Sequence, residues 1–394
     1  MNKELFLRTR RQLMERLDIA RELSDEEIRE QIDDLILNHT EEKMLSLKER
    51  IDLRQELFYS VRKLDILQEL LEDDTVTEIM VNGPDAVFVE REGKISRWNR
   101  TFTSREKLMD VIQQIAGRCN RVINESSPVV DARLPDGARV NAIVSPAALD
   151  GPVLTIRRFS ERPITMDRLI AFGSISPEGA EFLKKLVEAR YSIMIGGGTG
   201  CGKTTFLNAL SEYIPRGERI ITIEDNAELR LQGIENLVRL EAKNANTAGG
   251  TSVTIRDLIR TALRCRPDRI IVGEVRGGEA LDLLTALNTG HEGSLSTFHA
   301  NSCRDMLSRL ETMTMMGMEL PMEAIRRQIA AGVEILVHLG RSTEGKRKVE
   351  EITEICGYKD GDILLNPLYK RNREGVLQLL GKLKRTEKLK KPEG

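Results

Sequence analysis

The sequence feature that most constrains this 394-residue chain is a glycine-rich stretch near its middle, Gly197–Thr204. Two glycines bracket four residues and are followed by lysine and threonine, which is the pattern of a phosphate-binding loop. Residues 191–195 precede it as a short buried strand, and residues 205–210 follow it as a helix. A helix that begins at such a loop directs its partial positive charge at phosphate groups. We therefore predict a polyphosphate site in an α/β domain.

The loop residues have separate expected roles. Its glycines let the backbone turn tightly and point several N–H groups inward. Lys203, expected on a solvated loop, would bridge the outer phosphates, and the Thr204 hydroxyl would ligate the Mg²⁺ that accompanies them. The predicted cofactors are therefore ATP and Mg²⁺. The predicted nucleotide-binding residues are Gly197, Gly198, Thr199, Gly200, Cys201, Gly202, Lys203, Thr204 and Thr205.

The hydrophobic periodicity divides the chain into four segments. Residues 1–60 are predicted to be a helical N-terminal segment, because apolar residues recur at helical spacing. Residues 61–160 are predicted to be an α+β domain, since their period changes to two between turn residues. Residues 161–176 are expected to be a linker with one short helix. Residues 177–394 alternate strands and helices, which predicts a mostly parallel sheet, followed by a terminal hairpin and a basic tail.

Composition excludes some classes of protein. Hydrophobic residues make up 40% and charged residues 31% of the chain, as in soluble globular proteins. The net charge of −2 and the aromatic fraction of 4% give no reason to expect direct binding of nucleic acid. The five cysteines form no C-x-x-C pair, which favours a reducing cytoplasm, and no apolar run is long enough to span a membrane. The lysine-rich tail at 382–391 is expected to be solvated rather than bound to lipid.

Two predicted strands end in carboxylates. ATP hydrolysis needs a carboxylate that orients water and cations that meet the charge on the transferred phosphoryl group. Glu274 follows the apolar strand 269–273 and is the first candidate for the residue that polarises water. Gly273 stands where a strand-end aspartate is usual, so Mg²⁺ is expected to be held mainly by Thr204, phosphates and water. Glu224 ends a second strand and is the other candidate for placing water or metal.

Two histidines and several arginines complete the candidate residues. His291 and His299 flank the predicted strand 294–298, and both are expected to lie beside the γ-phosphate. A metal site on these histidines is not expected, because no cysteine or carboxylate cluster completes it. In the α+β domain, Arg133, Arg139 and Arg157 lie on predicted strands, where solvated arginines are the ordinary explanation.

Four sequence boxes together resemble those of the type II/type IV secretion ATPases. Residues 197–205, 223–229, 266–276 and 289–301 are similar to the Walker A, acidic, atypical Walker B and histidine boxes of that superfamily. Residues 130–141 are similar to the CpaF (TadA-type) branch, the motors of tight-adherence pili. The resemblance covers roughly residues 60 to 360.

The resemblance implies more than the spacing does. It implies a PAS-like α+β domain and a RecA-like ATPase domain in a homo-hexameric ring, cytoplasmic and peripheral on the cytoplasmic face of the membrane. Such a ring hydrolyses ATP and drives an inner-membrane platform protein that extrudes or retracts pilin. By the same resemblance, Arg133 and Arg157 fall where the family has arginines that reach nucleotide phosphates, and Arg139 is a weaker candidate.

Three alternatives stay open at this point. One is a conjugation-type secretion ATPase that exports DNA or protein. Another is a nucleotide-gated scaffold with little turnover, since no strand-end aspartate accompanies Glu274. A third is a RecA-like nucleic-acid motor, which the low aromatic content and near-neutral charge disfavour.

Overall fold

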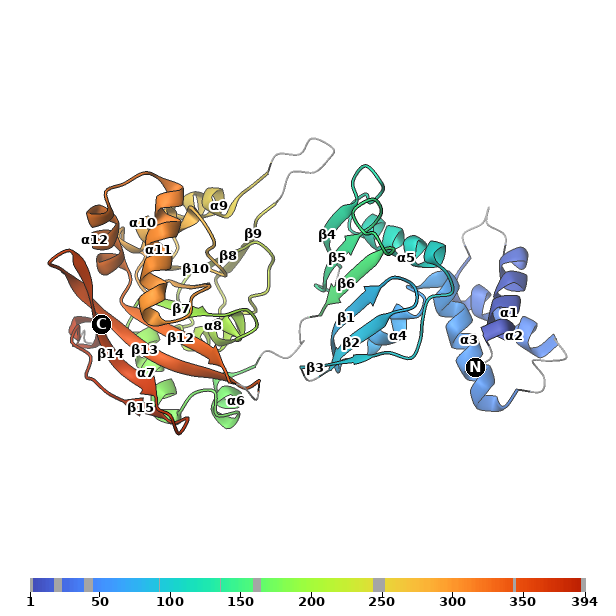
Figure 1. Cartoon of the computed structure of the whole chain (residues 1–394), viewed down its shortest axis with the longest axis horizontal. Coiled ribbons are helices and arrows are strands. Elements are labelled where there is room, and N and C mark those ends of the chain that lie inside the picture. Colours follow the sequence, from blue (N-terminus) through green and yellow to red (C-terminus); the bar gives the residue numbers. More distant parts are fainter. Residues whose placement is uncertain are drawn as a thin grey trace. The chain divides into compact units, whose positions relative to one another are not determined.

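The computed structural model describes residues 3–17, 23–38, 45–91, 93–134, 136–158, 164–243, 252–342 and 345–390 (Figure 1). The chain forms two compact units, Met1–Glu161 and Arg162–Gly394. Within the described ranges, no helix combines the length and the apolar composition needed to cross a membrane.

The first unit begins with helices that have a core of their own. Helices α1 (Lys3–Arg16), α2 (Asp25–Asn38) and α3 (Leu47–Arg62) bury Leu13 and Leu57 in one apolar cluster. Ser24 and Glu27 form reciprocal bonds that cap the start of α2, because each side chain accepts from the other residue's backbone N–H. Helix α3 continues past residue 60, the expected end of the helical segment.

The remainder of the first unit is an antiparallel sheet covered by helix α5 (Arg105–Arg118). The sheet has the order β3-β2-β1-β6-β5-β4, and α4 (Leu67–Glu72) precedes it. The apolar side of α5 packs with the strands through Leu108, Val111, Ile112 and Ile115. The strands are β1 (Val76–Asn82), β2 (Val87–Arg91), β3 (Lys94–Arg97), β4 (Val129–Arg133), β5 (Arg139–Ile143) and β6 (Val153–Arg157).

The second unit is built on a nine-stranded sheet with the order β15-β14-β13-β12-β7-β11-β10-β8-β9. The six strands from β12 to β9 are parallel, and β12 to β15 pair antiparallel. Both the mostly parallel sheet and the terminal hairpin are therefore as predicted. The strands are β7 (Ile193–Gly197), β8 (Ile220–Glu224), β9 (Leu237–Glu241), β10 (Arg269–Val272), β11 (Leu295–Phe298), β12 (Ile335–Arg341), β13 (Arg347–Lys359), β14 (Asp362–Arg371) and β15 (Leu377–Leu379).

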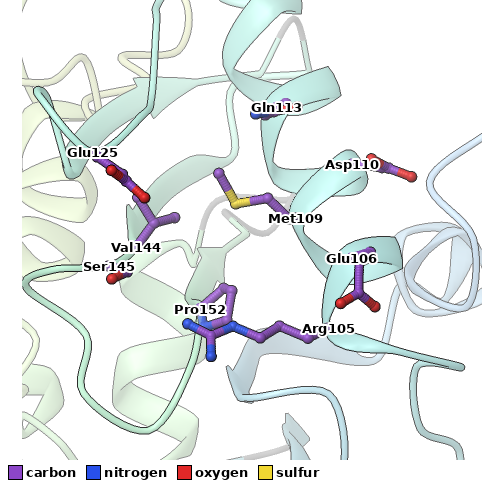
Figure 2. Close-up of a pocket in the computed structure, with 9 residues that line it drawn as sticks. All are labelled: Arg105, Glu106, Met109, Asp110, Gln113, Glu125, Val144, Ser145 and Pro152. Carbon is purple, nitrogen blue, oxygen red and sulfur yellow. The ribbon is translucent and has the colours of Figure 1, made fainter.

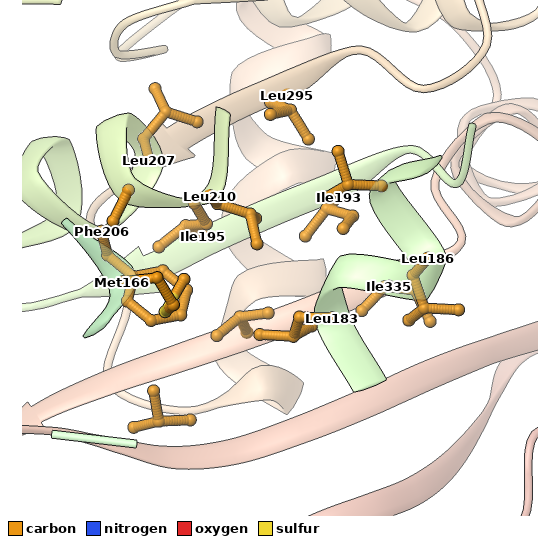
Figure 3. Packing of buried hydrophobic residues seen from close by; sticks show 14 of the residues in the cluster. Met166, Leu183, Leu186, Ile193, Ile195, Phe206, Leu207, Leu210, Leu295 and Ile335 are labelled. Atoms are coloured by element: carbon orange, nitrogen blue, oxygen red, sulfur yellow. The ribbon is translucent and has the colours of Figure 1, made fainter. Parts of the chain in front are cut away.

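Helices cover both faces of this sheet. Ile193 and Ile195 of β7 belong to the apolar cluster of α6, α7 and α8, which Figure 3 shows from close by. Met194, between them, belongs to the cluster of α9 to α12 on the other face, as the alternation of a strand requires. The helices are α6 (Met166–Ala171), α7 (Pro177–Glu188), α8 (Lys203–Ser211), α9 (Ile255–Ala262), α10 (Glu279–Leu287), α11 (Cys303–Gly317) and α12 (Met322–Gly332).

The short helix of the expected linker is part of the second unit. Met166 and Leu169 of α6 are buried in the same cluster as Phe206 of α8 (Figure 3). The backbone N–H of Met166 also donates to the Glu212 carboxylate at 3.3 Å. Met166 and Leu169 therefore contribute to the core of the second unit.

The basic tail is docked on the second unit, so the expectation of a solvated tail is wrong for the described residues. The fully buried carboxylate of Glu354 accepts from the backbone N–H groups of Lys384 and Arg385. The ammonium of Lys388 lies 2.8 Å from the buried carboxylate of Glu334, just before the short helix ends at Lys390. Two buried acids that need partners thus hold the tail in place.

Candidate active site

The phosphate loop connects β7 to α8. Strand β7 ends at Gly197, and α8 begins at Lys203 after a left-handed turn at Gly202, whose φ is 90°. Only glycine adopts this conformation readily, and the turn leaves the first N–H groups of α8 directed at the loop. A Cβ added at Gly198 or Gly200 would have no atom within 4 Å, so that side of the loop is open. The loop therefore fits a polyphosphate at a helix N-terminus.

The Cys201 side chain points away from this open side. It is only 3% exposed, and its Sγ lies 2.5 Å from the position of a Cβ added at Gly197. Burial raises the pKa of this thiol. Cys201 therefore offers its backbone, rather than its thiol, to a ligand.

The Lys203 ammonium is held inside the loop. It donates to the carbonyl oxygens of Gly197 at 3.1 Å and Gly198 at 3.2 Å. The residue is 9% exposed, so the expectation of a solvated lysine is wrong, and burial lowers its pKa. A cation already oriented within the loop needs little reorganisation to meet phosphate oxygens.

His299 connects this lysine to Glu274. Its Nδ1 lies 3.4 Å from the Lys203 Nζ, and its Nε2 lies 3.0 Å from the Glu274 Oε1. Burial, followed by the Lys203 charge, lowers the pKa of His299, which favours the neutral ring. A neutral ring with its acceptor at Nδ1 suits the Lys203 ammonium, whereas the Glu274 Oε1 beside Nε2 is buried without a hydrogen-bond partner among the described residues. The structure thus brings together three residues predicted from separate boxes.

Arg276 holds the other side of the Glu274 carboxylate. Its Nε donates to Glu274 Oε2 at 2.9 Å, and its Nη1 lies 3.6 Å from Asp225. Arg276 therefore orients the carboxylate through Oε2, and the His299 ring lies beside Oε1, which is buried without a hydrogen-bond partner among the described residues. Such a group can orient and polarise a water molecule, which is the role that the sequence suggests for it.

Glu224 lies at the end of the adjacent strand β8, and its carboxylate binds the backbone of the loop that follows. Its Oε1 accepts from the backbone N–H groups of Glu228 and Leu229, both at 2.8 Å. Burial raises its pKa to about 7, against these two hydrogen bonds, which lower it. Its Oε2 is buried without a hydrogen-bond partner among the described residues. Glu224 therefore caps the loop that follows β8.

His291 does not lie beside the phosphate loop, so this expectation is wrong within one subunit. It precedes β11, whereas His299 follows it, and β11 runs parallel to β7. Residues before a parallel strand lie at the edge opposite the one where the loop follows β7. The His291 ring contacts the Ala286 carbonyl at 3.3 Å, and the nearby Gly293 backbone donates to Ser192, just before β7.

Three arginines form a row across the sheet of the first unit. Arg133 of β4 pairs directly with Arg139 of β5, and Arg139 pairs with Arg157 of β6. Directly paired residues of antiparallel strands project from the same face. The register therefore adds Arg139, the weaker candidate from sequence, to the two arginines that the resemblance indicated. On the other side of Arg157 the register continues to Glu78 of β1, so the three arginines are followed by a carboxylate.

Arg347 is a residue of the site that the sequence did not suggest. It begins β13, and its Nε donates to the carbonyl of Gly200 in the phosphate loop at 2.8 Å. It is 147 residues from Gly200 along the chain. No local pattern marks such a contact, because it depends on the parallel pairing of β12 with β7.

A cavity of about 630 Å³ opens beside the loop. It lies between the loop and helix α11, and the sequence did not suggest its polar residues on α11. A spacing signal was present, because polar residues follow Asn301 at helical intervals on one side of α11. The lining residues are Gly198, Thr199, His299, Ala300, Asn301, Asp305, Ser308, Arg309 and Thr312.

Comparison with known proteins gives the family. The family model described as "Type II/IV secretion system protein" matches residues 61–362. The chain belongs to this family. The match includes the first unit's sheet and all four boxes, so the superfamily suggested by the sequence is confirmed.

Individual relatives of this secretion system protein agree with the family match. It is 39% identical over 295 residues to a Mycobacterium tuberculosis protein with a provisional conjugal-transfer name, covering 73% of this chain and 83% of the relative. It is 34% identical over 306 residues to the type IV secretion system protein VirB11 of Brucella suis, covering 70% and 84% of the two chains. The crystal structure of the pilus retraction motor PilT with bound ADP aligns with a TM-score of 0.54 at 21% identity, covering 75% and 83%. The α/β fold class is thereby confirmed.

The site of this secretion system protein fits a nucleotide with its metal. The open loop, the oriented ammonium of Lys203 and the N-terminus of α8 suit the phosphates. Thr204, in the first turn of α8, is the residue whose hydroxyl would hold Mg²⁺ together with phosphate oxygens and water. Among the described residues, no group of three histidines, cysteines or carboxylates forms a separate metal site.

A second pocket of this protein, of about 440 Å³, lies in the first unit (Figure 2). Its walls come from α5 and from residues beside β5 and β6. Met109, Val144 and Pro152 form its apolar part, and Arg105 extends beside Pro152 in Figure 2. The predicted catalytic residues are all absent from its lining.

Proposed function

We propose that this protein is the ATP-hydrolysing motor of a secretion machine, converting ATP and water to ADP and phosphate. The observation that carries the proposal is the contact of His299 with both Lys203 and Glu274, at 3.4 Å and 3.0 Å. The contact supports the proposal because Lys203, the His299 ring and the Glu274 carboxylate lie together at one end of the parallel sheet. Ligands of open α/β sheets bind at this end.

Each residue has a role in the proposed reaction. Lys203 binds the outer phosphates, and Thr204 holds Mg²⁺, which neutralises phosphate charge when bound. Glu274 orients the attacking water, and Arg276 fixes the carboxylate. His299 responds to the γ-phosphate through Lys203. Its ring is neutral, so it can exchange its hydrogen-bond partner Lys203 for another group when Lys203 binds phosphate.

The arginine row of the first unit is proposed to supply further positive charge. Arg133 and Arg157 would reach the phosphates when nucleotide is bound, with Arg139 between them in register. Loss of such cations slows phosphoryl transfer far more than it weakens nucleotide binding, because charge spreads over the phosphoryl oxygens in the transition state.

We further propose the tight-adherence pilus branch, the CpaF/TadA type, because residues 130–141 resemble that branch. In this proposal the protein is a cytoplasmic homo-hexamer, peripheral on the membrane, that acts on an inner-membrane platform protein. A conjugation-type exporter of DNA or protein is the second candidate, which the names of the relatives favour. Deletion of the gene separates them: loss of surface fibres supports the pilus motor, and loss of transfer without loss of fibres supports the exporter.

The catalytic proposal is tested with Glu274→Gln. We expect hydrolysis to fall about 100-fold or more while ADP affinity changes little, because only the water-orienting charge is lost. The matched control is Glu323→Gln, which removes an exposed carboxylate paired with Arg327 on α12. Turnover would be measured at several protein concentrations, since a ring assembles by mass action.

Two results would contradict the proposal in different ways. Near-normal turnover of Glu274→Gln would reject Glu274 as the water-orienting residue. If the unaltered protein binds ATP but hydrolyses it negligibly at all concentrations, the nucleotide-gated scaffold is the better description.

A further inference from the structure

We propose that the cavity between the phosphate loop and α11 is a binding site for inorganic phosphate leaving the γ position, with Arg309 as its cation. The inference rests on the proposed hydrolysis of ATP at the loop. Arg309 and the other cavity-lining residues of α11 lie outside the four sequence boxes, whereas the opposite wall belongs to the first and the last box.

The position of the cavity follows from His299. This residue contacts the Lys203 ammonium at 3.4 Å, so it marks the end of the loop where the outer phosphates lie. The same histidine lines the cavity, together with Gly198 and Thr199 of the loop. The cavity is therefore the space next to the γ-phosphate. At about 630 Å³, it has ample room for one hydrated phosphate.

The far wall of the cavity carries hydrogen-bonding groups from α11. Arg309, Ser308 and Thr312 line it from successive turns, and Asn301 lies just before the helix. The guanidinium of Arg309 has no ion pair or hydrogen bond with any residue that the structure describes. Its charge also contributes to lowering the pKa of His299, in agreement with its position on the same side of the loop. An unpaired guanidinium is well suited to phosphate oxygens.

Asp305 lines the same cavity, and its carboxylate opposes an anion there. The Asp305 carboxylate lowers the affinity for phosphate that Arg309 would otherwise provide, because the negative charges of the carboxylate and the phosphate repel each other. A product that must leave after every cycle requires a site of moderate affinity. The presence of one arginine and one aspartate in the cavity wall is consistent with such a site.

The test is inhibition of the full-length ATPase by added potassium phosphate, against potassium chloride of equal ionic strength. Arg309→Ala should raise the phosphate concentration for half inhibition about tenfold or more, since a hydrogen bond to a charged partner is lost. Arg309→Lys should restore part of the effect. Affinity for ADP should stay within about twofold of the unaltered protein, because in this proposal Arg309 binds the released phosphate and not the diphosphate.

The matched control is Arg304→Ala. Arg304 lies on the same helix but faces Asp362, with its Nη2 2.9 Å from that carboxylate. We expect the phosphate concentration for half inhibition of Arg304→Ala to equal that of the unaltered protein. Binding of phosphate to the ADP-loaded protein, followed by ³¹P nuclear magnetic resonance, gives a readout that needs no turnover. It separates failure of this inference from failure of the proposed hydrolysis.

Three outcomes would overturn the inference. One is a lack of phosphate binding and inhibition in the unaltered protein. Another is phosphate inhibition that is the same in Arg309→Ala as in the unaltered protein. The third is a parallel loss of ADP affinity in Arg309→Ala, which would place this arginine on the nucleotide rather than on released phosphate.

Discussion

The Glu224 side chain occupies the space that a side chain at Gly273 would need. A Cβ added at Gly273 would lie 2.9 Å from the Glu224 Cγ. The two residues are neighbours because β8 and β10 pair in parallel register, with Ile223 opposite Val272. Only one acidic side chain fits between these strand ends, and it comes from β8. This explains in steric terms why glycine replaces the strand-end aspartate before Glu274.

The first prediction follows from this contact. Gly273→Ala should destabilise the protein by about 1–3 kcal/mol, the usual range for added volume in a packed site. In the Glu224→Ala background the same change should cost clearly less, because the obstructing side chain is gone. Urea denaturation of the two single variants and the double variant measures the coupling.

Gly217→Ala is the matched control, since a Cβ there would meet no atom within 4 Å. Independent, additive effects of Gly273→Ala and Glu224→Ala would show that the two side-chain positions do not compete.

The second prediction concerns the titration of Glu224. Burial raises its pKa to about 7, compared with about 4.5 in the unfolded chain. The folded state therefore binds the extra proton between these values, and stability falls as pH rises through that window by up to about 3 kcal/mol. Glu224→Gln retains an oxygen for the N–H groups of Glu228 and Leu229 but cannot ionise.

The stability of Glu224→Gln relative to the unaltered protein should increase from pH 5 to pH 8. Urea denaturation at both pH values measures this difference. A constant difference across the range would mean that Glu224 titrates alike in the folded and unfolded states.

The sequence predicted what depends on local pattern. Short apolar runs predict the parallel strands, and serine is typical of a helix N-cap, as at Ser104 before residues 105–118 and at Ser176 before Pro177. The structure confirms both, because each serine side chain accepts from the backbone N–H three residues later, at Lys107 and Gly179. Glycine spacing identified the phosphate loop. These features depend on residues that are neighbours in the sequence, so they can be predicted without the tertiary structure.

The sequence failed where the answer depended on partners far along the chain. His291 and His299 look equivalent as neighbours of one strand, but strand polarity places them at opposite edges. Arg269 begins a predicted apolar strand, yet it is fully buried with its Nη2 donating to Glu218 at 3.0 Å. Periodicity reports which face is buried and does not report which distant group neutralises a charge.

The third prediction tests Arg347, whose Nε donates to the Gly200 carbonyl. Arg347→Ala should weaken nucleotide binding about fivefold, a modest value because both groups are solvent-exposed. Turnover at saturating ATP should change less, since the contact positions the loop and does not touch the reacting water. Arg347→Lys should restore part of the affinity.

Arg341→Ala is the matched control for Arg347, because Arg341 lies on the same hairpin and bonds the Gly345 carbonyl instead. Titration with a fluorescent ADP analogue measures the affinities. Equal loss of affinity in both variants would assign the effect to the charge of the hairpin and not to the contact with Gly200.

The fourth prediction concerns the docked tail. Glu354 is fully buried and accepts from the N–H groups of Lys384 and Arg385 and from the Asn366 side chain. Glu354→Ala should destabilise the second unit by about 3 kcal/mol or more, because buried donors lose their acceptor. It should also speed hydrogen exchange at Lys384 and Arg385 selectively. Lys390→Ala, at an exposed tail position, should do neither, and unchanged exchange in Glu354→Ala would show that other contacts hold the tail.

The last prediction addresses the arginine row of the first unit. Arg133, Arg139 and Arg157 are paired side by side across three strands. Like charges in direct register are unfavourable in a sheet, and a bound anion would reduce this repulsion beyond what Glu78, paired directly with Arg157, provides. Phosphates of bound ATP are that anion in our proposal, and the row acts when charge spreads over the transferred group.

Arg133→Ala and Arg157→Ala should therefore each lower turnover about 100-fold or more, with ADP affinity nearly unchanged. Single-turnover hydrolysis and ADP titration on the full-length protein measure the two quantities separately. Arg97→Ala is the matched control, because Arg97 lies on β3 and bonds the Asp85 carbonyl outside the row. If turnover of Arg133→Ala and Arg157→Ala equals that of Arg97→Ala, the first unit contributes no cation to catalysis. Catalysis would then depend on Lys203, Arg276 and Mg²⁺ within the second unit.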